Sequence, residues 1–377
     1  MKCAGAVGAM AAGGVAWRAY DQGVFSVGAG PAYEQWINWR TEDPDDLQNL
    51  VRAAILAANP HDSQPWKFRV TPDQIDVYAD TSRNLGSVDP FRREMYLGLG
   101  CALENLLLTA EAGSYACRLS LMPDDDATHV ATVGLSKGDS RPSALYHAIP
   151  LRHTNRGPYD RARIVDIGSL NALRDLNEDD DIAVFWFTTD ADRSRIGDLT
   201  VKATEVIIAD SEQDADSCRW NRSSWQEVQE HKDGITVDTS GLPGYMIILS
   251  KILPAQSHEQ NDKYWLSSTR DNQVATAGAY GIIAARDSHD NVMRLKGGRL
   301  YQRMSLSATV DGMATQPMNQ MLERAERESV LGIEPSFGNA LADLTGKDWQ
   351  ALILFRIGYP SINAGRSPRR DLKDVLI

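Results

Sequence analysis

The side chains best suited to chemistry in this sequence are two groups of arginine residues. The first group stands in the segment Arg152-His153-Thr154-Asn155-Arg156, and the second, Arg366, Arg369 and Arg370, lies near the C-terminus. Guanidinium groups hold a phosphate through bidentate, charge-assisted hydrogen bonds, so both groups could serve a phosphorylated ligand even in an acidic protein. The alternative for the second group is a solvent-exposed tail, which is the commoner role of basic residues near a terminus.

A short polar loop is the second feature that could contact a ligand. The segment Pro60-His61-Asp62-Ser63-Gln64-Pro65 follows a stretch with one apolar stripe at helical spacing. Asp43-Pro44 predicts the start of this helix, and Asn59-Pro60 predicts its end because the residue before a proline avoids the α region. Such a loop can offer hydrogen-bond partners to a flat ligand, although its local sequence alone favours an ordinary helix-to-strand connection.

Composition and motifs argue against several classes of function. The 377 residues carry 39 Lys and Arg against 51 Asp and Glu, and this net charge of −12 argues against nucleic acid or an anionic membrane as a partner. No GxGxxG follows a strand pattern, and the sequence has no P-loop, GxSxG or HExxH motif. The cysteines, Cys3, Cys101, Cys117 and Cys218, have no CxxC spacing and are predicted to be buried thiols, so no metal is assigned.

The elements that would position these groups are predicted from periodicity and turn residues. Those of the first half are a hairpin at 68–79, a buried helix at 97–112 and a strand at 128–136. The polar segment 138–142 is predicted to join two halves. The chain then divides into an N-terminal arm at 1–40, extended and lying on the core from residue 18, a first half at 41–141 and a second half at 142–377.

The second half repeats part of the first. Its predicted helix at 293–311 resembles the helix at 97–112, and glycines stand near both, Gly98 and Gly100 in one case and Gly297 and Gly298 in the other. Such glycines allow close packing or the approach of a ligand. One weak repeat indicates two similar domains and not a solenoid. The other predictions for this half are a helix at 164–176, strands at 182–188 and 350–357, and an insertion at 210–264.

The N-terminal segment leaves two alternatives open. Cys3–Trp17 is rich in Ala and Gly and is too short and too weakly apolar to span a membrane. It resembles the middle of an export signal, but only Lys2 precedes it. The chain is therefore expected to be either cytoplasmic or exported by a twin-arginine-like signal, and in the first case the segment would pack on the protein as an arm.

Taken together, four motifs resemble the nitroreductase family of flavin proteins, and most closely its double-length, Acg-like branch. They are Pro60–Trp66, Arg152–Arg156, Ala308…Gly312…Gln316-Pro317 and Ser367–Leu372, and they occur in the family's order between Asp43 and the C-terminus. The resemblance implies an α+β fold in which a nitroreductase-like unit is duplicated in one chain. A monomer would then act as a pseudo-dimer, with a higher oligomer left open.

The resemblance also implies an FMN site between the two halves. Arg152, Thr154 and Arg156 would hold the phosphate together with Arg369, with Asn155 in the same segment and with help from Arg366 or Arg370. His61, Asp62, Ser63 and Gln64 would face the isoalloxazine, and Thr315, Gln316 and Pro317 would line its other edge. Asp62 stands where many family members have Asn, which puts its direct contact with the flavin in question. The acidic segment 177–181 of the second half lacks the QPW sequence, so one flavin site per chain is implied.

The resemblance implies an NAD(P)H-dependent oxidoreductase in which the flavin carries the redox chemistry, so no catalytic side chain is assigned. The alternative is an FMN storage or sequestration protein with little turnover, because the insertion at 210–264, with Trp220 and Trp225, could cover the site as a lid. Whether the chain is an enzyme stays open between these two. A structural protein with a vestigial site is the third and weakest alternative, because both halves of one site are present.

Overall fold

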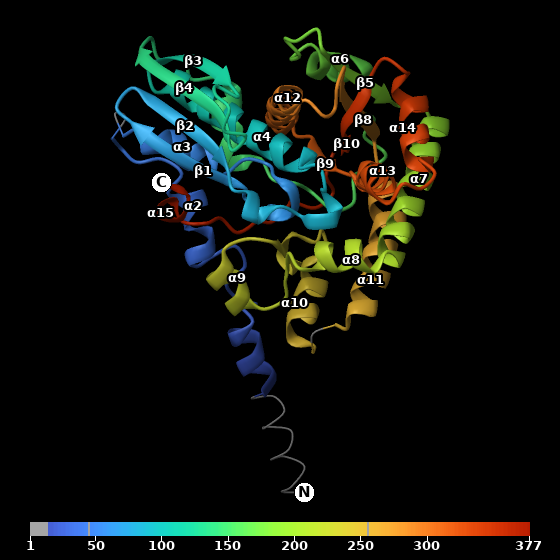
Figure 1. Ribbon diagram of the computed structural model, residues 1–377. Coiled ribbons are helices and arrows are strands. Elements are labelled where there is room, and N and C mark those ends of the chain that lie inside the picture. Colours follow the sequence, from blue (N-terminus) through green and yellow to red (C-terminus); the bar gives the residue numbers. More distant parts are fainter. Residues whose placement is uncertain (1–13, 44–45, 255) are drawn as a thin grey trace, which may run out of the picture.

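Two antiparallel sheets form the framework of the computed structural model, which describes residues 14–43, 46–254 and 256–377 (Figure 1). The first sheet has the order β1-β2-β4-β3 and the second the order β5-β8-β10-β9. The strands of the first are β1 (Trp66–Thr71), β2 (Gln74–Ala79), β3 (Tyr115–Leu121) and β4 (His129–Lys137). Those of the second are β5 (Ile182–Phe187), β8 (Ala279–Ala285), β9 (Ala314–Pro317) and β10 (Gln350–Gly358).

The two halves have the same connectivity. In each, two strands precede a 20-residue helix and two strands follow it, and the four strands pair in the same antiparallel order. The helices are α4 (Arg93–Ala112) and α12 (Asn291–Val310). They lie side by side between the sheets (Figure 1). The expected α+β fold is therefore confirmed, and the repeated strand order is consistent with a duplicated nitroreductase-like unit.

Glycine lets α4 and α12 meet backbone to backbone. A Cβ on Gly298 would lie 2.1 Å from the carbonyl oxygen of Leu97, and one on Gly100 would lie 2.2 Å from that of Leu295. No larger side chain fits at these crossing points. Polar contacts join the same two helices: the Glu104 carboxylate accepts hydrogen bonds from Arg299 and Arg303 at 2.9 and 2.8 Å.

The Gly298→Ala variant is expected to be less stable by about 1–3 kcal/mol, the usual cost of forcing a methyl group into a packed contact. Urea titration followed by circular dichroism measures the change. Gly338→Ala is the matched control, since the nearest atom to its added Cβ would be 3.5 Å away. An equal loss of stability in the two variants would contradict the backbone contact.

Helices and connections surround this framework. The helices not yet given are α2 (Glu34–Ile37), α3 (Gln48–Ala54), α5 (Ala144–Ala148), α6 (Ile167–Arg174), α7 (Asp190–Ala209), α8 (Ser211–Cys218), α9 (Trp225–His231), α10 (Gly244–Ile252), α11 (His258–Ser267), α13 (Gln320–Leu331), α14 (Ser336–Thr345) and α15 (Leu372–Val375). A two-stranded sheet of β6 (Asn221–Arg222) and β7 (Ile235–Thr236) lies in the insertion. Among the described residues, no helix is both long and apolar enough to cross a membrane.

Three sequence predictions need correction or fall outside the described residues. The helix expected to end at Asn59 ends at Ala54, because Leu56 and Ala57 turn their carbonyl groups to buried arginines. The arm at 18–40 packs on the core, but it is partly helical at 14–21 and 34–37 and not extended. Pro44 and most of Cys3–Trp17 lie outside the described residues.

The C-terminal segment crosses from the second half to the first. After β10 the chain runs along the first sheet, where Leu376 forms a bridge with Phe68 and the amide of Ile377 donates to the Phe68 carbonyl at 2.9 Å. On the way, the amide of Arg369 donates to the Ala32 carbonyl at 2.8 Å. This path brings the C-terminal arginines beside the loop at 60–64.

Candidate functional site

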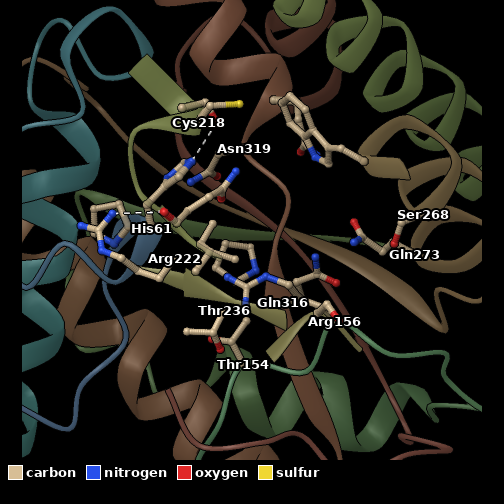
Figure 2. Close-up of a pocket in the computed structure, with 18 of the residues that line it drawn as sticks. His61, Thr154, Arg156, Cys218, Arg222, Thr236, Ser268, Gln273, Gln316 and Asn319 are labelled. Carbon is tan, nitrogen blue, oxygen red and sulfur yellow. Dashed lines mark hydrogen bonds between the residues drawn. The ribbon is translucent and has the colours of Figure 1, made fainter. Parts of the chain in front are cut away.

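A cavity of about 500 Å³ lies where the two halves and the insertion meet (Figure 2). This volume falls within the range of small-molecule sites. The first half contributes Asn59, His61 and Gly98, and the second half contributes residues of the segment at 152–156 and of β9. The insertion contributes wall residues between Ser217 and Tyr264. Of the residues predicted from sequence, the cavity wall contains His61, Thr154, Arg156, Gln316 and Pro317.

The arginine segment presents one guanidinium to the cavity and buries another behind it. Arg156 lines the cavity and donates to the Thr239 carbonyl of the insertion at 3.3 Å. Arg152 is 2% exposed, and it donates from Nη2 to the Leu56 carbonyl at 3.3 Å. Its Nε and Nη1 have no partner among the described residues. Burial lowers the pKa of Arg152 to about 10, so the group is still charged at neutral pH, and it forms no ion pair with a described residue.

Asn155 and Thr315 have structural contacts instead of facing the cavity. Asn155 donates from Nδ2 to the Ile362 carbonyl at 2.6 Å, and its Oδ1 accepts from the amide of Gly157 at 2.8 Å. The Thr315 hydroxyl is buried against those of Tyr301 and Ser305, at 3.2 and 2.9 Å. Both residues hold the neighbouring cavity-lining positions in place.

The loop at 60–64 adopts a strained backbone. His61, Asp62 and Gln64 have φ values of 49°, 54° and 52°, in the left-handed region that non-glycine residues rarely occupy. Asn59 holds the loop, because its Oδ1 accepts from the Gln64 amide at 2.7 Å and its Nδ2 donates to Asp62 at 3.2 Å. Strain of this kind persists where surrounding contacts impose it and is typical of functional sites.

Pro60 and His61 are the residues of this loop that line the cavity, and His61 is the polar one. Its Nε2 lies 3.2 Å from the Ser217 hydroxyl of the insertion (Figure 2). Burial, reinforced by the nearby charge of Arg156, lowers the pKa of His61 to about 4. The imidazole is therefore neutral at neutral pH, and it can exchange donor and acceptor roles between its two nitrogens.

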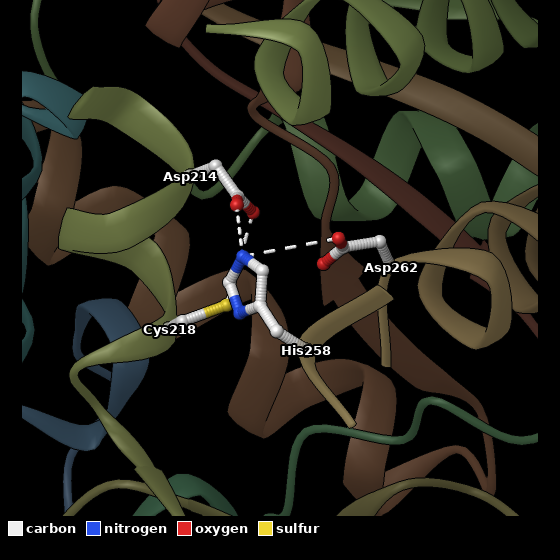
Figure 3. Close-up of side chains that lie close together, drawn as sticks. All are labelled: Asp214, Cys218, His258 and Asp262. Carbon is white, nitrogen blue, oxygen red and sulfur yellow. Dashed lines mark hydrogen bonds and ion pairs between the residues drawn. The ribbon is translucent and has the colours of Figure 1, made fainter. Parts of the chain in front are cut away.

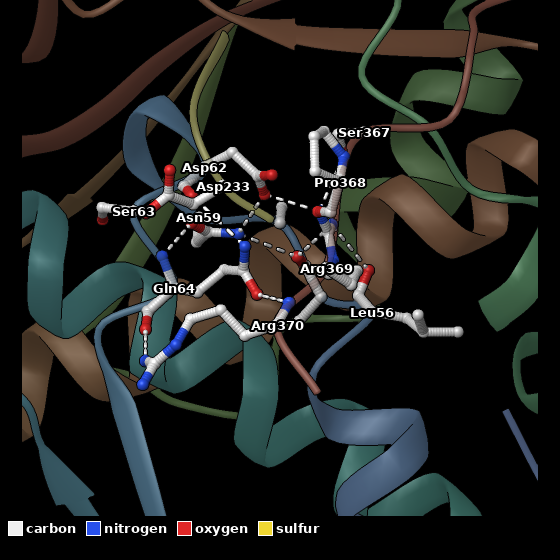
Figure 4. A network of polar contacts seen from close by, with 12 residues as sticks. Leu56, Asn59, Asp62, Ser63, Gln64, Asp233, Ser367, Pro368, Arg369 and Arg370 are labelled. Atoms are coloured by element: carbon white, nitrogen blue, oxygen red, sulfur yellow. Dashed lines mark hydrogen bonds and ion pairs between the residues drawn. The ribbon is translucent and has the colours of Figure 1, made fainter. Parts of the chain in front are cut away.

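Asp62 faces a C-terminal arginine and not the cavity (Figure 4). Its Oδ1 accepts from Nη1 of Arg369 at 2.5 Å, while its Oδ2 is buried without a partner among the described residues. Arg369 also donates to the Ser367 hydroxyl at 2.6 Å and to the Ala57 carbonyl at 3.2 Å. Most donors of this guanidinium are thus engaged by the protein itself.

The remaining predicted residues anchor the loop. Gln64 accepts from the Arg370 amide at 2.8 Å and donates to the Lys232 carbonyl at 2.9 Å (Figure 4). Ser63 is buried, and its carbonyl accepts from Arg83. Arg366 is exposed. The structure therefore gathers the predicted residues around one cavity but divides them into a lining set, a buried set behind it and one exposed arginine.

Comparisons with known proteins find relatives along most of the chain. No family model matches the chain. A Mycobacterium tuberculosis protein provisionally named an NAD(P)H nitroreductase is 24% identical over 357 residues, covering 93% of this chain and 95% of the relative. Acg from the same organism is also provisionally named an NAD(P)H nitroreductase. It is 22% identical over 339 residues, which cover 88% of this chain and 95% of Acg. The chain is therefore similar to Acg-like nitroreductases over most of its length.

Two solved structures are also similar. The FMN-dependent nitroreductase NfnB from Mycobacterium smegmatis, in complex with NADPH, is 17% identical, with coverage of 61% of this chain and 96% of that chain and a TM-score of 0.37. A protein from Anabaena variabilis that is provisionally named a nitroreductase is 11% identical. The match covers 87% of this chain and 91% of the solved chain, with a TM-score of 0.41.

Sequence reasoning missed Arg356, which organises one side of the cavity. This arginine is fully buried in β10 and donates to Gln316 Oε1 at 2.7 Å and to the Gly157 and Asn155 carbonyls at 2.7 and 3.2 Å. It thereby holds the segment at 152–157 against β9. The available signal was a single arginine in the otherwise apolar run Ala351–Ile357.

Ion pairs and hydrogen bonds fasten the insertion to the C-terminal segment and to the first half. Lys232 pairs with Asp371 of the C-terminal segment at 2.7 Å, and Asp233 accepts from Arg83 of the first half and from Arg222. The tryptophans expected to limit access do not line the cavity. Trp220 packs in a cluster with Leu85 and Val88, and Trp225 stacks on Tyr33 of the N-terminal arm. The tryptophan in the cavity wall is Trp265.

The Asp62→Asn variant is expected to change how stability depends on pH. Burial raises the pKa of Asp62 from its ordinary 3.8 to about 6, in spite of Arg369. Between these values the folded chain keeps a proton that the unfolded chain has lost, so the free energy of unfolding falls as pH rises, by at most about 1.4 kcal/mol per pH unit. Urea titrations across the window should show a flatter dependence in Asp62→Asn.

Asp125→Asn, which changes an exposed carboxylate, is the control for this series. It should reproduce the pH dependence of the unaltered chain. A dependence that persists unchanged in Asp62→Asn would show that another group takes up the proton.

Proposed function

We propose that the chain binds one FMN in the cavity between its halves and acts as an NAD(P)H-dependent oxidoreductase with slow turnover. The names of its relatives support a nicotinamide donor, and the solved relative NfnB is described as FMN-dependent and in complex with NADPH. The residues of this chain support a site for a phosphorylated, flat ligand. No acceptor is proposed, because the cavity wall does not select one.

The observation that carries the proposal is the buried guanidinium of Arg152, which forms no ion pair with a described residue. Two of its nitrogen atoms, Nε and Nη1, are buried without a partner among the described residues. Leaving a charged donor unsatisfied in the interior is costly, so such a group is expected to be retained for an anion. Thr154 and Arg156 lie at the cavity wall on the same segment. These three side chains suit the phosphate of FMN.

The other residues would orient the ligand and tune its surroundings. When bound, FMN supplies hydride transfer, so the chain needs no acid or base of its own for that step. His61 is neutral and offers a hydrogen bond, and Gln316 is fixed by Arg356. The pairing of Asp62 with Arg369 reduces the repulsion that a free carboxylate would exert on an electron-rich ring.

One flavin per chain is proposed because the equivalent loop of the second half, at 177–181, uses its polar side chains in contacts within the protein. Asn177 donates from Nδ2 to the carbonyls of Asp179 and Ile182, at 3.0 and 2.8 Å. The Asp179 carboxylate pairs with Lys296 at 2.5 Å. This loop offers acidic groups where the loop at 60–64 offers neutral hydrogen-bond partners.

The second candidate function is an FMN store, and the attachments of the insertion favour it. The ion pair of Lys232 with Asp371 and the bond from Arg156 to the Thr239 carbonyl hold the insertion over the cavity as a lid. A lid that stays closed would keep a bound flavin from NAD(P)H. The two functions share one binding site and differ in whether the lid opens.

The absorption spectrum of the purified chain, before and after incubation with FMN and gel filtration, tests the binding site. A bound oxidised flavin, near one equivalent per chain after reconstitution, is expected. A colourless chain that retains no FMN would overturn both the oxidoreductase and the store. Riboflavin, which lacks the phosphate, should be retained much less well.

A further inference from the structure

Four potential metal ligands converge where two helices of the insertion region meet. Asp214 and Cys218 are four residues apart on α8, and His258 and Asp262 are four residues apart on α11. Residues at this spacing share one face of a helix. Both pairs point into the space between the helices (Figure 3), and their ligand atoms all lie within 4.8 Å of one another.

We propose that these four side chains bind one zinc ion, or another divalent transition metal of similar softness. A thiolate and an imidazole favour such metals, whereas Ca²⁺ and Mg²⁺ take oxygen ligands. In a tetrahedral zinc site the ligand atoms are about 3.3–3.8 Å apart, given bonds of about 2.0–2.3 Å. Metal binding would replace the hydrogen bond between His258 and Asp214 and would draw the more distant ligand atoms, up to 4.8 Å apart, inward.

The contacts within the cluster suit a bound cation. His258 Nε2 bonds to Asp214 and also lies 3.8 Å from Asp262 Oδ2, so one imidazole serves two carboxylates. The Cys218 sulfur lies 3.8 Å from the other oxygen of Asp214. The side chains of Asp214 and Asp262 are only 8% and 14% exposed, so water screens their mutual repulsion poorly. A divalent ion would neutralise both.

The two helices are positioned independently of any metal. The Asp210 side chain caps α8 and accepts from Arg324 and Arg327 at 3.0 and 2.9 Å, which fixes α8 on α13. Ser257 and Gln260 form a capping box at the start of α11. Rigid elements of this kind favour a preorganised site. His258, with its side chain 55% exposed, leaves one side open for metal entry.

The site would fasten α8 to α11 beside the cavity. Cys218 and Asp262 also line the cavity, so the metal would stiffen that part of its wall. With all four positions supplied by protein, the site is of the closed, structural type. Sequence alone assigned no metal because the two pairs are separated by 40 residues without a recognisable spacing. The proposal does not depend on FMN binding.

The test uses the untagged full chain, freed of metal with a chelator and titrated with Co²⁺ and then Zn²⁺. We expect one Co²⁺ per chain, with a thiolate-to-cobalt charge-transfer band and tetrahedral d–d bands that Zn²⁺ displaces. Cys218→Ser should abolish the charge-transfer band, and His258→Ala should weaken binding at least about tenfold. Cys117→Ser and His231→Gln, outside the cluster, are the matched controls and should behave like the unaltered chain.

Hydrogen exchange gives a second readout that does not depend on spectra. Zn²⁺ should slow exchange of the α8 and α11 amides in the unaltered chain and leave it unchanged in Asp214→Asn with Asp262→Asn. Circular dichroism checks that each variant is folded. Binding that lacks the thiolate band, or that keeps its affinity in Cys218→Ser with His258→Ala, would show adventitious metal binding and overturn the proposal.

Discussion

Replacing Arg152 and Arg156 by alanine is expected to abolish most FMN binding. Each side chain should contribute about 1–3 kcal/mol, the usual scale for a hydrogen bond to a charged group. Arg152→Lys should restore only part of the loss, because lysine cannot reproduce the bidentate fork. Fluorescence quenching of FMN during titration of the ligand-free chain measures the affinities. Unchanged binding in Arg152→Ala would remove the basis for the phosphate assignment.

The free energy of unfolding of Arg152→Ala without FMN distinguishes a binding role of Arg152 from a structural one. Arg152 is charged, buried and short of partners, so its removal should leave the free energy of unfolding of the ligand-free chain unchanged or raise it. Arg356→Ala is the contrasting control. Its guanidinium satisfies Gln316 and two backbone carbonyls, so its loss should destabilise the ligand-free chain by at least roughly 2 kcal/mol.

If Arg152→Ala instead unfolds as readily as Arg356→Ala without FMN, Arg152 stabilises the fold and the proposed phosphate site loses its main support. The two measurements therefore distinguish loss of a ligand contact from loss of the folded chain. Arg161→Ala, which changes an arginine with a half-exposed side chain outside the cavity, should alter neither quantity.

The central helices could be predicted from sequence because their signals are local. The apolar run expected at 97–112 lies within α4, and the run expected at 293–311 nearly coincides with α12. The glycines near both helices left open close packing or the approach of a ligand, and Gly100 and Gly298 serve close packing. By contrast, β8 has the sequence Ala-Tyr-Gly-Ile-Ile-Ala-Ala, whose small residues have low strand propensity, and its position at the centre of the second sheet overrides that preference.

One missed element did carry a local signal. From Tyr115 to Leu121, buried or partly buried residues of β3 alternate with exposed ones. This two-residue period is typical of a half-buried strand. Its register with β4 then follows from the alternation.

The pairing of site residues could not be derived from sequence, because it depends on contacts between distant segments. Asp62 and Arg369 are 307 residues apart, and only the path of the C-terminal segment across the first sheet brings them together. The family resemblance placed Arg369 at a phosphate. In the structure its Nη1 donates to Asp62, and of the predicted arginines Arg156 lines the cavity.

Weakening the contacts that hold the insertion over the cavity is expected to speed the reduction of bound FMN by NAD(P)H. In Lys232→Asn with Asp233→Asn, two ion pairs of the insertion are lost, to Asp371 of the C-terminal segment and to Arg83 of the first half. At about 1–1.5 kcal/mol for each charged contact, opening would become roughly 30- to 150-fold more favourable. If opening limits the reaction, the rate should rise by the same factor. Anaerobic stopped-flow mixing with NADH and with NADPH follows the bleaching of the flavin.

Lys263→Ala is the matched control, because Lys263 pairs at 2.6 Å only with Glu259 of its own helix, where both side chains are largely exposed. This variant should reduce at the rate of the unaltered chain. Dithionite, which is small, should bleach the flavin in all three proteins. If dithionite does so while neither nicotinamide reduces the released variant, access is not what limits turnover, and the store replaces the oxidoreductase as the function of this site.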